Sequence, residues 1–187
     1  MKGYIYKLYA GADPSTGWTF NDPIFGKFST LGACMPNIRQ FVDVGDWVFA
    51  LSGKTPEVIP YVIGGFKVDE KIDALEAHAR FPDYRLKTND RGQIVGNIIV
   101  EKDGLHHPLD DHDKFDRRRA NYLVGQESVV IAGPRAIEAA REGTHSMLER
   151  VLNQKANRIS DLIPRWRKLD DGQVQKLIEE LHQIEGK

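Results

Sequence analysis

The residues with the clearest chemical potential lie in a run rich in histidine and aspartate between positions 106 and 116. Imidazole nitrogens and carboxylate oxygens serve as general acids and bases, and they are also ligands for zinc, manganese or iron. We therefore take His107, Asp110 and Asp111 as candidate catalytic residues. Their spacing matches no metal-binding motif, and a solvated loop whose aspartates cap turns is the alternative. We accordingly predict no metal site and no cofactor.

Cys34 is a further catalytic candidate, as a nucleophile. It stands just before Pro36, where a predicted helix begins, and a helix N-terminus can lower the pKa of a thiol. Free cysteine is also among the most buried residue types, so packing in the core is the alternative. A single cysteine cannot form an intrachain disulfide, and nothing in the sequence therefore indicates a secreted, disulfide-rich scaffold.

Motifs of the common nucleotide-using and hydrolytic enzymes are absent from the sequence. It contains no GxxxxGK[ST] loop, no GxGxxG between a strand and a helix, no GxSxG and no HExxH. This absence disfavours the common types of ATP-dependent and dinucleotide-dependent enzymes.

Charge is nearly balanced over the whole chain but not along it. The 26 basic and 27 acidic residues leave a net charge of −1, which argues against bulk electrostatic coating of nucleic acid. Residues 150–168 are nevertheless strongly basic, and lysine and arginine supply the phosphate contacts of nucleic-acid-binding proteins. The candidate phosphate-binding residues are Lys27, Arg158, Arg165 and Arg167. A solvated basic face balanced by the acidic C-terminal end is the alternative.

The elements expected to position these residues change in type along the chain. Alternating or continuous apolar runs with β-branched and aromatic residues predict strands near the N-terminus and through the middle of the chain. Gly64 and Gly65 within one of them predict a bulge or a tight barrel corner. Helical periodicity dominates the C-terminal part. The predicted strands and helices are strands at 4–10, 30–34, 44–51, 58–68, 94–100, 122–124 and 129–132, and helices at 36–41, 72–80, 134–141, 144–154 and 171–184. Thr144 and Asp171 are the predicted N-caps of the last two helices.

This order predicts an α+β fold with a mostly antiparallel small β-barrel or sheet followed by C-terminal helices. We expect a β-rich domain at residues 1–142 and a helical extension at residues 143–187 packed on it. No run of about 18 apolar residues and no secretory leader is present, so we expect no membrane association and, by exclusion, a cytoplasmic location.

Three segments of the first third resemble a known family. These are Gly17-Trp18-Thr19-Phe20-Asn21-Asp22-Pro23-Ile24-Phe25-Gly26, Thr30-Leu31-Gly32-Ala33-Cys34-Met35-Pro36-Asn37-Ile38-Arg39, and Val44-Gly45-Asp46-Trp47-Val48. In order and spacing they resemble the nucleotide modification associated domain family (type 2), over about residues 1–140. Asp22 departs from the Asn-Pro pair of the family, as do residues 132–135 from its aromatic-rich strand end. A weaker likeness is to PUA-like domains, including the EVE and ASCH domains.

The resemblance implies a role in a bacterial or phage system that modifies DNA bases, without an established reaction. It implies a module that binds DNA or a modified nucleotide. Asp46 could instead bond turn amides, and Trp47 could belong to the core. The residues implied are Trp18, Phe20 and Trp47 for stacking on a base, Asn21 and Asp46 for reading its edge, and Arg39 for holding phosphate.

Two other functions remain open at this point. The chain could be an enzyme of nucleotide or DNA base modification that uses His107, Asp110, Asp111 and Cys34. It could also be a structural subunit that contacts other proteins of a modification system through its amphipathic C-terminal helix.

Overall fold

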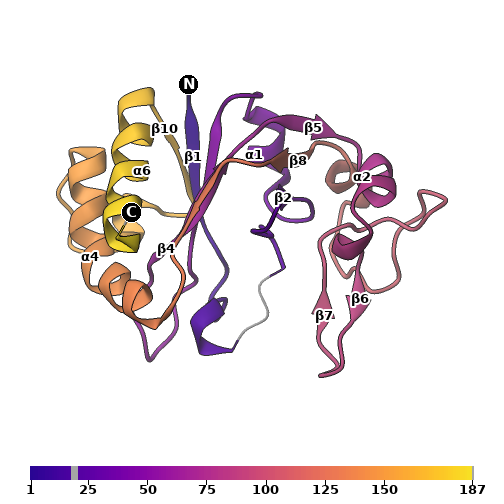
Figure 1. Ribbon diagram of the computed structural model, residues 1–187, viewed down its shortest axis with the longest axis horizontal. Coiled ribbons are helices and arrows are strands. Elements are labelled where there is room, and N and C mark those ends of the chain that lie inside the picture. Colours follow the sequence, from indigo (N-terminus) through magenta and orange to yellow (C-terminus); the bar gives the residue numbers. More distant parts are fainter. Residues whose placement is uncertain (18–20, 187) are drawn as a thin grey trace. The chain divides into compact units, whose positions relative to one another are not determined.

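The computed structural model describes residues 1–17 and 21–186, and Figure 1 traces the chain. It confirms the α+β class, and the chain divides into two compact units. Unit 1 contains residues 1–18, 45–67 and 127–187, and unit 2 contains residues 19–44 and 68–126. The expected domain boundary after residue 142 falls inside a helix of unit 1, and that division stays a prediction.

Unit 1 is built on a five-stranded sheet with the strand order β10-β1-β3-β4-β9. β1 and β3 run parallel, and the other neighbouring strands are antiparallel. Every residue of β3 is buried, which explains its continuous apolar sequence, since a strand covered on both faces has no polar side. The strands are β1 (Gly3–Lys7), β3 (Trp47–Leu51), β4 (Val62–Lys67), β9 (Ser128–Val130) and β10 (Trp166–Leu169).

The glycine pair of β4, Gly64 and Gly65, lies beside an irregularity in the pairing of β3 with β4. Ala50 pairs with Gly64 and Leu51 pairs with Val62, so the register shifts by one residue at this point. Gly65 lies directly against the ring of Phe49, which leaves no room for a side chain at that position. The bulge predicted from the sequence is confirmed.

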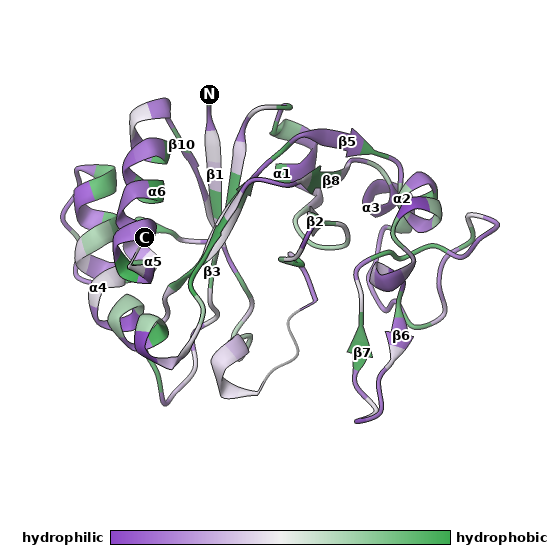
Figure 2. Ribbon diagram, in the orientation of Figure 1, coloured by the Kyte–Doolittle hydropathy of each residue, from purple (hydrophilic) through white to green (hydrophobic). Residues whose placement is uncertain are grey.

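Two long helices complete unit 1. Figure 1 shows α4 (Pro134–Leu152) and α6 (Asp171–Glu185) side by side, and the two helices are in contact. The apolar stripe of α6 is buried at Val174, Leu177 and Leu181, while hydrophilic residues cover much of its remaining surface (Figure 2). A short helix, α5 (Ile159–Leu162), precedes β10.

One prediction for this region is wrong, and one strand was not predicted. The helices expected at 134–141 and 144–154 form the single helix α4, because Thr144 does not cap a helix but lies buried in its interior. Its Oγ1 accepts a hydrogen bond from the Val62 amide at 3.2 Å, beside the register shift. Strand β10 was not expected, because its basic residues Arg167 and Lys168 lie in a stretch that resembles a solvated segment.

Unit 2 contains smaller sheets and short helices. Its three-stranded antiparallel sheet has the order β2-β8-β5, and β6 and β7 form a separate hairpin. Its core includes Phe81, Ile98, Ile99, Val100 and Tyr122. The elements are β2 (Ser29–Leu31), α1 (Pro36–Phe41), β5 (Glu70–Ile72), α2 (Ala74–Arg80), β6 (Lys87–Thr88), β7 (Ile94–Val95), α3 (Phe115–Arg119) and β8 (Tyr122–Gly125).

The sheets formed by residues 1–17 and 21–186 have free edges, so the small-barrel and PUA-like expectations are not confirmed. Among the same residues, no helix has the length and apolar character needed to cross a bilayer.

Candidate functional site

Asp22 is the centre of a buried polar network in unit 2. Its carboxylate accepts hydrogen bonds from the backbone amides of Gly32 at 2.8 Å and Ala33 at 2.9 Å, and from that of Cys34. Successive amides that converge on one anion form a nest, in which a negative charge satisfies donors that would otherwise be unpaired. Asp22, which departs from the Asn-Pro pair of the family, therefore has a structural role.

The network continues through Asn97, which is 1 % exposed. Its amide nitrogen donates to Asp22 at 2.9 Å and to Thr30 at 3.0 Å, and its amide oxygen accepts from the Tyr122 hydroxyl at 2.6 Å. Burial raises the pKa of Tyr122, which keeps the phenol protonated as a donor. Gly32 lies against both the Tyr122 ring and the Asn97 carbonyl, so no larger residue fits there. These contacts hold together segments from both parts of unit 2.

Cys34 belongs to the edge of this network. Burial, and then the neighbouring Asp22 carboxylate, raise the pKa of its thiol. A raised pKa disfavours the thiolate that acts as a nucleophile. The geometry therefore favours the packing alternative for Cys34.

Arg39 is fully buried, and its side chain is directed at backbone carbonyls. Burial lowers the pKa of its guanidinium to about 10, so it remains charged at neutral pH. An arginine has five N–H donors, and each has a carbonyl acceptor here. The acceptors are the carbonyl oxygens of Ala33, Cys34, Arg118, Ala120 and Asn121. The expectation that Arg39 holds phosphate is corrected accordingly, because no donor is left for a ligand.

Asp46 and Trp47 also have internal roles, in unit 1. Asp46 is 4 % exposed and accepts a hydrogen bond from the Lys2 backbone amide at 2.8 Å. Trp47 is 3 % exposed and stacks on Phe49, with ring centres 5.5 Å apart. Their burial supports the structural alternatives rather than contact with a base.

The other residues expected to contact a base lie in or near the undescribed segment. Trp18 and Phe20 fall outside the described residues. Asn21 donates a hydrogen bond to the Ile94 carbonyl at 2.6 Å, which joins it to the hairpin of unit 2. Stacking by Trp18 and Phe20 stays a prediction.

The histidine- and aspartate-rich run brings two imidazoles to one carboxylate. Asp110 accepts hydrogen bonds from His106 Nε2 at 2.7 Å and from His112 Nδ1 at 2.6 Å. The Asp110 side chain is only 3 % exposed, whereas about a third of each imidazole is accessible. His107 does not join them; its Nδ1 accepts from the Leu109 amide at 3.1 Å.

The pKa shifts follow from this geometry. Burial by itself would raise the pKa of Asp110, but the hydrogen bonds from His112 and His106 outweigh burial and hold that pKa below its usual range. The hydrogen bond to Asp110 raises the pKa of His112, against the opposing effect of burial. The cluster thus favours an ionised carboxylate beside a positively charged imidazole.

An aromatic ring and two arginines adjoin the cluster. The rings of His106 and Phe115 stack with centres 4.4 Å apart, and the Arg119 guanidinium lies 5.8 Å from the Phe115 centre. Arg118 is close enough to lower the pKa of His112 electrostatically. We call the set formed by His106, Asp110, His112, Phe115, Arg118 and Arg119 the histidine–arginine face.

The cluster supplies some of the ligands that a metal site would need. Asp110, Asp111 and His112 offer ligand atoms that lie within 4.8 Å of one another. A structural zinc site needs four ligands and a catalytic one needs three with an open position. Both Asp110 oxygens already accept hydrogen bonds from imidazoles, so a metal ion would have to displace them.

The four residues predicted to contact phosphate are divided between the two units. Lys27 lies in unit 2, 5.7 Å from the centre of the Phe28 ring, whereas the three arginines lie in unit 1. Arg158 pairs with Asp161 at 2.9 Å, and Arg167 donates to Gln154 at 2.8 Å. Arg165 is exposed. The basic stretch is therefore partly neutralised by its own neighbours.

The sequence predicted acid–base chemistry for this run and selected His107 as its histidine, but it did not show that His106 and His112 are the two partners of Asp110. The available signal was weak, because the run is an irregular loop in which no periodicity shows which side chains converge. The remaining indication was that His106 and His112 lie on either side of Asp110 in the sequence.

Comparison with known families places the chain among proteins associated with nucleotide modification. Specifically, the chain belongs to the family described as nucleotide modification associated domain 2, whose model matches residues 15–127. This confirms the resemblance seen in the sequence. Neither a curated protein nor a solved structure matches the chain.

Proposed function

We propose that the chain is a nucleotide- or DNA-binding module of a system that modifies DNA bases. Membership of the nucleotide modification associated family supports the general role. The observation that carries the binding role is the histidine–arginine face, which lies within the matched residues. There an accessible imidazole stacks on Phe115 next to two arginines.

The chemistry of this face suits a nucleotide. Aromatic rings and imidazoles stack on bases without regard to sequence, and arginine contacts phosphate. Arg118 makes hydrogen bonds only to the Asp113 and Ala33 carbonyls among the described residues, so its charge is not cancelled by a carboxylate. A protonated His112 would add a further positive charge.

In this proposal, recognition of a modified base uses Trp18 and Phe20, which retain their predicted stacking roles. Arg39, Asp46 and Trp47 act indirectly, by holding the fold. Partners are DNA or a modified nucleotide, and a cytoplasmic location stays a prediction.

Fluorescence anisotropy with labelled single-stranded DNA, with and without a modified base, tests the proposal. Phe115→Leu combined with His106→Ala should weaken binding by about ten-fold, since stacking contributes about 1–3 kcal/mol per base. Arg91→Ala, an exposed arginine of the β6–β7 turn, is the matched control. Equal affinity of the double variant and the wild type would overturn the proposal.

One observation favours an enzyme as the second candidate. A buried carboxylate bonded to two accessible imidazoles can orient an imidazole and stabilise its charged form during proton transfer. Asp110→Asn should then abolish turnover of a nucleotide substrate while leaving its binding within a few-fold. Turnover that survives this substitution would exclude the role.

A further inference from the structure

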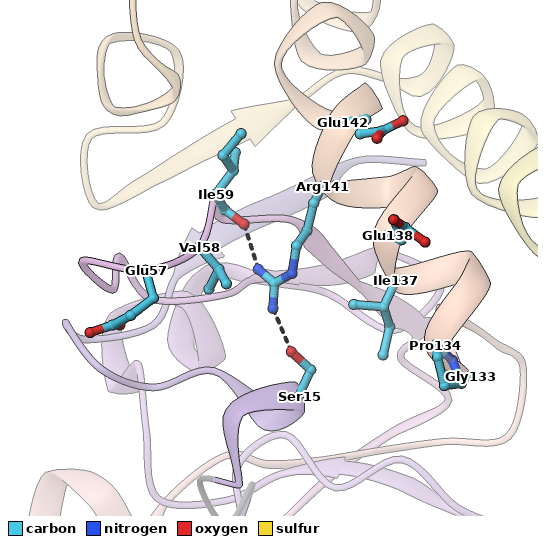
Figure 3. A pocket seen from close by; sticks show the side chains of 10 residues that line it. All are labelled: Ser15, Glu57, Val58, Ile59, Gly133, Pro134, Ile137, Glu138, Arg141 and Glu142. Atoms are coloured by element: carbon cyan, nitrogen blue, oxygen red, sulfur yellow. Dashed lines mark hydrogen bonds between the residues drawn. The ribbon is translucent and has the colours of Figure 1, made fainter.

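Unit 1 contains an open pocket between the start of α4 and the loop at residues 57–59, with a volume of about 720 Å³ (Figure 3). Ser15 of the 3-10 turn η1 (Pro14–Thr16) completes its lining. No residue of the histidine–arginine face lines it. The pocket is thus separate from the site proposed above, and its lining shows which ligand it could take.

Arg141, one of the residues that line the pocket, is held in an ion pair. Arg141 donates to both carboxylate oxygens of Asp13 at 2.8 Å, and also to the Ser15 hydroxyl and the Ile59 carbonyl. Its guanidinium carbon lies 4.7 Å from the centre of the Tyr61 ring. Because Asp13 is fully buried and holds this charge, Arg141 is committed to internal contacts and does not make the pocket a site for anions.

Three exposed glutamates are among the residues that line the pocket. Glu138 and Glu142 lie four residues apart on α4, and Glu57 lies on the opposite wall (Figure 3). Within the described part of the chain, none of the three has a hydrogen-bonding or ion-pair partner. Like charges at this helical spacing destabilise a helix, and a cation between them would relieve the repulsion.

Between the carboxylates the surface is apolar. Val58, Ile59, Pro134 and Ile137 contribute to the wall, and Ile59 is 56 % exposed. In Figure 3, Ile137 projects from α4 toward the space in front of the Arg141 guanidinium. This lining suits a ligand that combines positively charged groups with apolar groups.

We propose that this pocket docks an extended segment of a partner protein in which two basic side chains flank apolar residues. Lysine and arginine match such a surface because their methylene stems cover apolar area while their charged heads meet carboxylates. The same carboxylates repel nucleic acid, so the pocket complements the nucleotide site by taking a ligand of opposite charge. It would connect the chain to another protein component.

The test is a binding titration of the full chain at low salt with a fluorescein-labelled peptide that has two lysines separated by three leucines. Two comparison peptides replace the lysines with glutamates or the leucines with serines. The proposal predicts saturable binding of the first peptide, weaker binding of the serine peptide, and none of the glutamate peptide. Failure of the lysine peptide to bind, or equal binding of all three, would overturn it.

Substitutions then locate the site. Glu57→Gln, Glu138→Gln and Glu142→Gln should each weaken binding about two- to five-fold, the range for exposed ion pairs, and the triple variant should weaken it further. Ile59→Ser should weaken binding without changing its salt dependence. Glu179→Gln on α6, an exposed glutamate outside the pocket, is the matched control and should bind as the wild type does.

Two results would contradict the assignment. Wild-type affinity in the triple variant would show that the peptide binds elsewhere. Light scattering that shows self-association of the wild type, lost in the triple variant, would mean that a second copy occupies the pocket rather than a partner protein. Circular dichroism should show all variants folded, because the substituted side chains are exposed.

Discussion

Arg39 donates its five N–H groups to five backbone carbonyls, so its contribution is to the interior of unit 2. Its type and its place in the family-like segment made it resemble a phosphate ligand. The same features that suit arginine to phosphate, a constant charge and a fixed fork of donors, also suit it to join carbonyls from separate segments. Burial distinguishes the two uses, and burial depends on contacts distant in the sequence.

Arg39→Lys should destabilise the protein by about 2–4 kcal/mol, because lysine has three donors and cannot pair all four of the carbonyls that depend on Arg39, the Ala33 carbonyl being also bonded by Arg118. Urea unfolding followed by circular dichroism measures the effect. The exposed Arg91→Lys is the control, and it should change the free energy of unfolding by less than about 0.5 kcal/mol. Similar stabilities of the two variants would contradict the role of Arg39.

Asp110→Asn should lower the pKa of His112, since the hydrogen bond to Asp110 is the main cause that raises it. A raised folded-state pKa stabilises the fold below the unfolded value of about 6.5, and this contribution is lost as pH rises through the folded pKa. The lowered pKa of Asp110 stabilises the folded state at pH values above the unfolded pKa of about 3.9. This stabilisation is lost as the pH falls through the folded-state pKa of Asp110. The Tm difference between wild type and variant should therefore be larger at pH 5.5 than at pH 8.5, and a pH-independent difference would contradict the coupling.

At the scale of elements, α6 shows how a helix boundary is set. Asp170 accepts from the Gln173 amide at 2.9 Å, and the Gln173 side chain accepts from the Asp170 amide at 3.1 Å. This capping box satisfies donors that the first helical turn leaves unpaired. The sequence placed the cap one residue later, at Asp171.

Asp170→Ala should cost about 0.5–2 kcal/mol, the usual effect of removing a cap. Asp171→Ala should cost less, because the two contacts of Asp171 are exposed: an ion pair with the N-terminal amine at 3.6 Å and a hydrogen bond from the Gln175 side chain at 3.2 Å. Thermal unfolding of both variants would compare the two effects directly. The reverse order would show that Asp171 is the effective cap.

Elements with local signals were predictable from the sequence. Helix α1 has the expected bounds, Pro36–Phe41, because proline at its first position marks the start. Strand β10 was missed because its sequence has no apolar run, and it becomes a strand only by pairing with β1 from the other end of the chain. Thr144 was misread for a related reason, since its hydrogen-bond partner, Val62, is distant in the sequence.

The candidate site was predictable only in part. The composition of the run at 106–116 indicated acid–base chemistry, but not which histidines contact Asp110. The aromatic and acidic residues Trp47 and Asp46 were assigned to a ligand because exposure cannot be read from residue type. Nothing in the sequence predicted the ion pair between Asp13 and Arg141, because the two residues lie far apart in the sequence and meet only in the folded chain.

At the scale of the whole molecule, the C-terminal helix is part of unit 1. Its apolar residues Val174, Leu177 and Leu181 are buried and are not available to a partner. Contact with other proteins through the remaining surface of this helix stays a prediction. The pocket beside α4 is the surface that we propose for a partner.

Deleting residues 170–187 should consequently destroy the cooperative unfolding of unit 1, because it exposes the apolar residues that α6 covers on α4. Thermal melting followed by circular dichroism would measure the loss of cooperative unfolding, and light scattering would show whether an oligomer is lost instead. A truncated protein with an unchanged Tm would show that the helix is dispensable for the fold.

The most direct test of the nucleotide-binding role uses the six histidines as internal reporters. Their ring signals can be followed by NMR while single-stranded DNA is added to the full chain. The signals of His106 and His112 should shift with saturation, whereas those of His145 and His182 in unit 1 should not. Saturable binding that leaves His106 and His112 unshifted would contradict the assignment of the histidine–arginine face.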